Sequence, residues 1–272
     1  MKAKLILLVH SLRRVRTLVL VMGTLLGLFQ VILVVVASSF ENSGQFAQIG
    51  NLFPPFMRSL LGPAMASFLS FEGFLGLGYF DPPIIGGAVG LAIALATRLT
   101  LEVESGFIDL VLARPVARHW VVTRSILVIV LSIAVTMGMM LAGSWIGLRF
   151  LAPAGVMWPS AKLLGSLALS LGMLALSWSG IALMIAAVSR RRGVASGLSG
   201  VLALLAFLVD YVARLWEPAK LAARFSPFTY FNPLDLVMGT PVDTTNLLVL
   251  GGIAVGSFAA AYVLFLRRDI SR

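Results

Sequence analysis

The chain has 272 residues and no cysteine, and 59% of its residues are hydrophobic while only 12% are charged. Soluble domains carry roughly 25% charged residues, and a soluble fold of this composition would expose too much apolar surface to water. The composition therefore excludes a soluble enzyme, a nucleic-acid-binding domain and a disulfide-stabilised secreted domain. It predicts a polytopic membrane protein.

Six apolar stretches are long enough to cross a bilayer, because a spanning helix needs about 20 apolar residues. They cover about residues 17–37, 83–101, 125–148, 163–188, 194–213 and 247–266. We therefore expect an all-α fold, with residues 1–272 forming a single transmembrane domain. The first stretch is long and lacks a small-residue cleavage pattern, so it is expected to be a retained span and not a signal peptide.

The net charge of +10 is unevenly distributed among the loops. With the N-terminus inside, the inner segments hold fifteen Lys and Arg residues: Lys2, Lys4, Arg13, Arg14, Arg16, Arg98, Arg114, Arg118, Arg124, Arg190, Arg191, Arg192, Arg267, Arg268 and Arg272. The outer segments hold six: Arg58, Arg149, Lys162, Arg214, Lys220 and Arg224. By the positive-inside rule, both termini are predicted to be cytoplasmic.

Two outer segments are too long to be simple turns. In residues 40–82, apolar residues recur at helical spacing and suggest an amphipathic interfacial helix. Residues 214–246 are aromatic and contain Pro227 and Pro233, which is typical of interfacial aromatic residues or of a kinked re-entrant path.

The inner loop between the second and third spans has the most informative pattern. Glu102 and Glu104 precede Gly106, and four apolar residues that follow form one stripe. Pro115 ends this short helix at or before Arg114. A short amphipathic helix of this kind, over about residues 103–118, is suited to docking in a groove of a partner protein.

At these residues the chain resembles the ABC-2 type permease family, the membrane subunits of many ATP-binding-cassette exporters. The residues that match the family pattern are Glu102, Glu104, Gly106, Asp109, Ala113, Arg114, Pro115 and Arg118. Phe107 departs from it, since the family often has Thr after the glycine. The six spans, the inner termini and the late Ser226-Pro227-Phe228 and Asn232-Pro233 segments extend the resemblance over most of the chain.

The resemblance implies that residues 103–118 form a coupling helix that contacts a separate ATPase. The chain itself has no G-x-x-x-x-G-K-[ST] loop, so ATP and Mg²⁺ would bind to the partner and this chain would carry no cofactor and no catalytic residue. By family likeness, two ATPase subunits and two permease chains form an exporter in a bacterial plasma membrane. A homodimer of permease chains is expected, but the sequence does not distinguish it from a heterodimer. The basic N-terminal segment is a further candidate for contact with the ATPase or with anionic lipid.

Small residues open the fifth span, where Gly193, Ser196, Gly197 and Gly200 form small-xxx-small pairs. They predict close helix packing, either within one subunit or across a dimer. Later in the same span, Asp210 and Arg214 are one turn apart and are expected to pair. His10 and His119 have no metal-ligand pattern around them, so no metal site is expected.

Two other classes of protein remain as alternatives. An integral-membrane enzyme acting on lipid would need a charged catalytic cluster, and a secondary transporter would need ionisable groups near the bilayer midplane. A third reading keeps the ABC assembly but gives it a signalling role. Apolar spans suit a lipid-like, drug-like or other amphiphilic cargo, but the sequence identifies no substrate-binding residues and no transport direction.

Overall fold

The computed structural model describes residues 2–43, 70–105 and 118–267, and all their regular structure is helical. The longer helices are α1 (Lys2–Asn42), α4 (Phe71–Phe80), α5 (Pro82–Ala96), α6 (Arg98–Glu104), α8 (Arg118–Leu151), α9 (Ala161–Val188), α10 (Arg192–Ala213) and α13 (Thr244–Arg267). Four short elements join α10 to α13, namely η1 (Glu217–Ala219), α11 (Lys220–Ala223), η2 (Pro227–Tyr230) and α12 (Pro233–Val237). The predicted all-α class is confirmed.

Six helical segments of the described residues are long and apolar enough to cross a membrane. They are Leu7–Asn42, Phe71–Glu104, His119–Leu151, Ala161–Val188, Arg192–Ala213 and Thr244–Arg267. Each contains one of the six predicted spans. The second is much longer than the predicted 83–101, because α4, α5 and α6 follow one another with breaks of a single residue. At the first break Asp81 has an extended backbone, and Pro82 begins α5.

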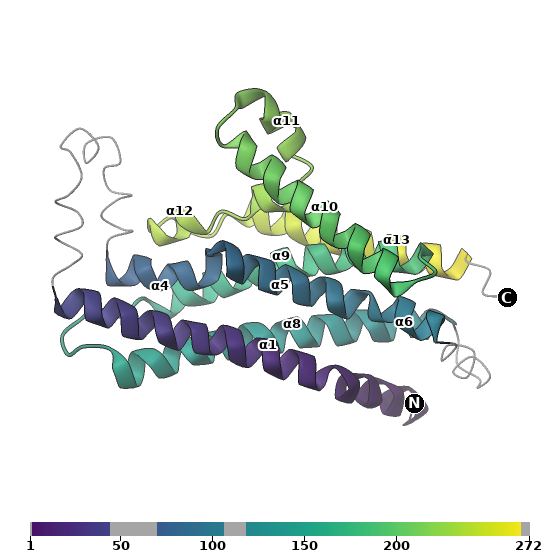
Figure 1. Cartoon of the computed structure of the whole chain (residues 1–272), viewed down its shortest axis with the longest axis horizontal. Coiled ribbons are helices and arrows are strands. Elements are labelled where there is room, and N and C mark those ends of the chain that lie inside the picture. The colour runs from purple at the N-terminus through teal and green to yellow at the C-terminus, as the bar shows by residue number, and fades with distance from the viewer. Residues whose placement is uncertain (1, 44–69, 106–117, 268–272) are drawn as a thin grey trace.

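The long helices lie side by side along the long axis of the molecule (Figure 1). Helix α1 begins and α13 ends at the same end of this bundle, which we call the terminal end, and α6 lies there too (Figure 1). Helix α10 crosses the bundle obliquely from the terminal end, and α11 lies beyond its far end, in contact with α10 (Figure 1). The placement of both chain ends at one end agrees with an even number of spans.

Helix α9 is the central element of the bundle and packs against α5, α8, α10 and α13. Its contact with α13 depends on small residues: a Cβ on Gly180 would lie 2.9 Å from the carbonyl oxygen of Ala254. The hydroxyl of Ser177 donates a hydrogen bond to the Leu250 carbonyl over 2.8 Å. Lipid tails are as apolar as the helix surfaces, so such close backbone packing is a main source of helix association in a bilayer.

A buried polar cluster joins α1, α4 and α8. The side-chain amide of Gln30, 2% exposed, donates to the carbonyl of Gly78 over 2.5 Å. The hydroxyls of Tyr79 and Ser144 are 2.9 Å apart, and Ser144 also donates to Gln30 Oε1 over 3.4 Å. Because each polar group here has a partner, the cluster fixes the position of α4 against the other two helices.

Two long segments, residues 40–82 and 214–246, connect spans of the bundle. The expected interfacial helix within residues 40–82 falls largely on residues 44–69, which lie outside the described residues. In the second segment Pro227 and Pro233 each begin a short helix, as a broken path requires. Phe228 and Phe231 of this aromatic segment are buried, and Phe228 packs against Trp178 with ring centroids 5.5 Å apart.

Candidate coupling site

The predicted coupling helix, about residues 103–118, lies mostly outside the described part of the chain. This applies to Gly106, Asp109, Arg114 and Pro115, and also to the side chain of Arg118, the first residue of α8. Glu102 and Glu104 are described, at the end of α6. The described part of the site therefore consists of the two helical segments that flank the loop, which are α6 before it and the start of α8 after it.

An ion pair connects the two flanks of the loop. The guanidinium of Arg124, on the first turns of α8, donates a hydrogen bond to Oε2 of Glu102 on α6. The Arg124 side chain is 5% exposed and that of Glu102 is 16% exposed. Removing one partner of such a pair leaves an uncompensated buried charge, which is strongly unfavourable. The pair therefore holds the start and the end of the loop at a fixed separation.

Glu104 connects the same loop to α10. Its Oε2 accepts a hydrogen bond of 2.9 Å from the backbone N–H of Arg192, the first residue of α10. The N-cap residue Arg191 makes no side-chain capping bond, so Glu104 takes the place of a capping side chain from another helix. A carboxylate at this position also interacts favourably with the helix dipole of α10.

Helix α6 also contacts the end of α9. The hydroxyl of Thr100, fully buried, donates to the carbonyl of Ala186 over 2.9 Å. This bond satisfies a carbonyl in the last turn of α9, which has no partner further along its own helix. One short helix is thus bonded to α8, to the end of α9 and to the start of α10.

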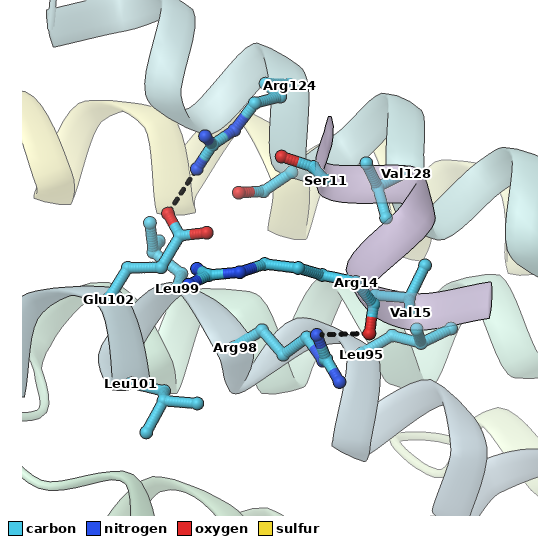
Figure 2. A pocket seen from close by; sticks show the side chains of 11 residues that line it. Ser11, Arg14, Val15, Leu95, Arg98, Leu99, Leu101, Glu102, Arg124 and Val128 are labelled. Carbon is cyan, nitrogen blue, oxygen red and sulfur yellow. Dashed lines mark hydrogen bonds and ion pairs between the residues drawn. The ribbon is translucent and has the colours of Figure 1, made fainter. Parts of the chain in front are cut away.

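Arg98 brings α1 into the same site. Its Nη1 donates to the backbone carbonyl of Arg14 over 3.1 Å, and a small pocket lies between α1, α6 and α8 (Figure 2). Arg14, Arg98, Glu102 and Arg124 line this pocket together with Ser11 and apolar residues. We call the group Arg14, Arg98, Glu102, Glu104, Arg124 and Arg192 the α6 junction.

The glycines at the start of α10 do not pack against other helices among the described residues. Among the described residues, no atom lies within 4 Å of a Cβ built on Gly193, Gly197 or Gly200. Ser196 bonds only within its own helix, to the carbonyls of Arg192 and Gly193. The buried side of α10 carries instead Ala195, Ser199, Ala203, Asp210 and Ala213. The glycines therefore face away from the bundle.

The predicted pair between Asp210 and Arg214 is confirmed. Arg214 donates to Oδ2 of Asp210 from Nη2 over 2.9 Å and from Nε over 3.3 Å. The sequence did not reveal the third member, Thr229, whose hydroxyl donates to Oδ1 of Asp210 over 2.9 Å. The short helices η1 and α11 lie between Asp210 and Thr229 in the chain, so the contact between these two residues has no signature in the local sequence.

A larger cavity adjoins this pair. It has a volume of about 730 Å³ and lies between α10, the junction of α4 with α5, and the segment that follows α10. Its wall is largely apolar, with Phe80, Ile85, Phe207 and Phe231 among the lining residues. Charged residues of both signs also line it, namely Arg214, Lys220, Arg224, Asp210 and Asp235. The cavity is therefore amphipathic in character.

A metal centre has no support in the described ranges, where no three His, Asp or Glu side chains are grouped to hold an ion. Sequence reasoning missed the roles of Arg98 and Arg192. Both are basic residues at the ends of spans, and in the sequence this position indicates only membrane orientation.

Six apolar helices around a well-packed core, with a charged junction at one end, define a multi-pass integral membrane protein. A model of the ABC-2 family transporter proteins matches residues 10–270, and the chain therefore belongs to this family. It is thus a permease of an ABC transporter. A search of curated proteins finds no match to the chain.

Proposed function

We propose that this chain is the membrane subunit of an ABC exporter driven by a separate ATPase subunit. The observation that carries the proposal is the α6 junction, in which Glu102 and Glu104, two of the acids of the family-like loop, bond to α8 and α10. A loop that only joined two spans would need no such bonds. Movement of the loop would therefore be transmitted to the ends of α8 and α10.

The coupling step follows from these bonds. Nucleotide binding would bring two ATPase subunits together and displace the loop that is seated on them. Because Glu104 holds the N-terminus of α10 and Thr100 holds the end of α9, the displacement would move both spans. ATP can shift the permease between its states only through a difference in the affinity of the assembly for nucleotide in each state.

A second copy of the chain is proposed to pack on α10. The open side of this helix carries Gly193, Gly197 and Gly200, while its apolar neighbours Val194, Leu198 and Val201 are more than half exposed. Close approach of two such faces would bury small residues and bring backbones together, as in other membrane helix pairs. A homodimer with two ATPase subunits would complete the transporter.

The cargo is proposed to be lipid-like, drug-like or otherwise amphiphilic. The cavity of about 730 Å³ beside α10 is within the size range of small-molecule sites, roughly 300–1,000 Å³. Its aromatic wall would take the apolar body of such a molecule, and the basic residues at Arg214, Lys220 and Arg224 would lie near its polar end. By the charge distribution, the termini would be cytoplasmic. By family likeness, the membrane would be a bacterial plasma membrane.

Co-expression with an ATPase encoded beside this chain tests the function. We expect the two proteins to purify as a complex, and nucleotide hydrolysis to depend on both once reconstituted in lipid vesicles. Failure to associate would contradict the proposal. Transport or lipid modification by the isolated chain, with no ATPase present, would instead identify a secondary transporter or a membrane enzyme.

A further inference from the structure

The pocket within the α6 junction has an excess of positive charge. Three guanidinium groups, those of Arg14, Arg98 and Arg124, line it with one carboxylate, Glu102 (Figure 2). Cationic side chains gathered around one pocket favour the binding of an anion there.

The pocket also contains a hydrogen-bond donor without an acceptor. Nη1 of Arg98 donates to the Arg14 carbonyl, but Nε of Arg98 is buried and has no partner in the described chain. Arg124 is committed to Glu102, and the Arg14 side chain extends across the pocket toward Glu102 (Figure 2). Buried donors are nearly always paired, so an unpaired one beside an empty volume indicates a missing acceptor.

Size and surroundings limit what that acceptor can be. The pocket volume is about 50 Å³, a few times the roughly 10–15 Å³ that one water molecule needs by the same measure. There is room for a single small anionic group and none for a nucleotide. Val15, Leu95 and Val128 form an apolar wall, and Leu101 at the same pocket is 39% exposed. The anion is therefore expected to be joined to an apolar chain.

We propose that this pocket binds the phosphate group of an anionic phospholipid, with the acyl chains lying along α1 and α6. Arginine forks suit phosphate oxygens, and basic pockets between spanning helices are known positions for anionic headgroups. The phosphate bridges Arg14 on α1 to Arg98 on α6. Any effect of the bound lipid on coupling rests on the proposed function, because only then does the α6 junction transmit movement. Binding of the lipid does not depend on that function.

The test uses the full chain alone, purified in a neutral detergent and stripped of lipid, with binding followed by native mass spectrometry. The probes are dioleoyl phosphatidylglycerol, dioleoyl phosphatidylcholine and inorganic phosphate. We expect the phosphatidylglycerol to bind about tenfold more tightly than the phosphatidylcholine, as one or two charge-assisted hydrogen bonds imply. Inorganic phosphate at millimolar concentration should not displace it.

Arg14→Gln and Arg98→Gln should each remove most of this preference. Arg14 is exposed, so its replacement should leave the fold intact even if Arg98→Gln does not fold. The matched control is Arg149→Gln, an exposed cation in the last turn of α8, far from the pocket along that helix, which should keep the full preference.

Equal binding of the two lipids would overturn the proposal, as would equal losses in the Arg14 and Arg149 variants. Tight binding of inorganic phosphate alone would make this a site for a free anion and overturn the lipid assignment. No ATPase takes part in the measurement, so its result is independent of whether the chain couples to one.

Discussion

Gly143 on α8 faces Gly27 on α1 so closely that a Cβ on Gly143 would lie 2.3 Å from the carbonyl oxygen of Gly27. The neighbouring contact is similar, since a Cβ on Gly147 would lie 2.8 Å from a methyl group of Val34. Backbone atoms of Gly27 cannot rotate away as a side chain can. The α1–α8 contact therefore depends on glycine at position 143.

Gly143→Ala is expected to lower the stability of the protein by about 1–3 kcal/mol, the usual cost of forcing extra atoms into a packed contact. The measurement is the thermal unfolding midpoint in detergent. The control is Gly138→Ala on the same helix, where a Cβ meets no atom within 4 Å of the described chain. That change should be neutral or slightly stabilising, because alanine favours a helix. If both variants unfold at the same temperature, the close α1–α8 contact is wrong.

Glu104→Gln tests the connection between the loop and α10. The neutral amide makes a weaker bond to the Arg192 N–H than the carboxylate does, and the helix dipole no longer favours it. We expect transport by the assembled complex to fall about threefold to tenfold, in line with the worth of one charge-assisted bond at an exposed position. ATP hydrolysis should fall less than transport, so the ratio of the two is the quantity to measure.

The control for this variant is Glu41→Gln, an exposed acid near the far end of α1, which should leave the ratio of transport to hydrolysis unchanged. Arg114→Ala, within the predicted coupling helix, should lower the same ratio. If both Glu104→Gln and Arg114→Ala keep normal coupling, the loop between α6 and α8 is not the contact with the ATPase.

The sequence was sufficient for features that depend on one segment at a time. Span positions follow from apolar length, and the Asp210–Arg214 pair follows from a spacing of four on one helix. Partners from distant segments could not be found in this way: Glu102 meets Arg124 across the loop, and Glu104 meets the backbone of Arg192. Two helices supply each of these contacts, and only their packing brings the groups together.

The glycines illustrate the same limit. Small-xxx-small spacing predicted packing at Gly193 and Gly197, yet Gly23, Gly27, Gly143 and Gly147 have the same spacing in the first and third spans. The glycines of the first and third spans pack within the subunit, whereas Gly193 and Gly197 meet no other helix among the described residues. Spacing shows that two helices can approach closely, but the rotation of each helix in the bundle decides which glycines are used.

Asp210→Asn should destabilise the turn after α10. Its carboxylate is 10% exposed and accepts bonds from both Arg214 and Thr229, so the amide would leave the Arg214 guanidinium without its counter-charge. We expect a loss of about 1–3 kcal/mol, reduced because the Arg214 side chain is 54% exposed. The measurement is the unfolding midpoint in detergent, combined with proteolysis of the segment that follows α10.

Glu217→Gln is the matched control for that change, since Glu217 pairs with Lys220 over 2.5 Å on the surface, with both side chains more than half exposed. Exposed pairs of this kind contribute about 0–1 kcal/mol, so the control should unfold close to the parent protein. Equal effects of the two substitutions would mean that the Asp210 cluster is no more than a surface ion pair.

Gly197→Cys tests the proposed dimer through α10. The chain has no cysteine, so a single introduced thiol reports only on its own position. If two copies pack through the open glycine side of α10, oxidation in the membrane should link them into a disulfide-bonded dimer, since the Cα atoms at the centre of such a contact lie within bridging distance, about 4.4–6.8 Å. The dimer band on a non-reducing gel is the measurement.

Gly138→Cys, on an exposed and equally open position of α8, should stay monomeric under the same oxidant. Efficient cross-linking at both positions would indicate random collision, and a monomer at both would place the interface between copies on another helix.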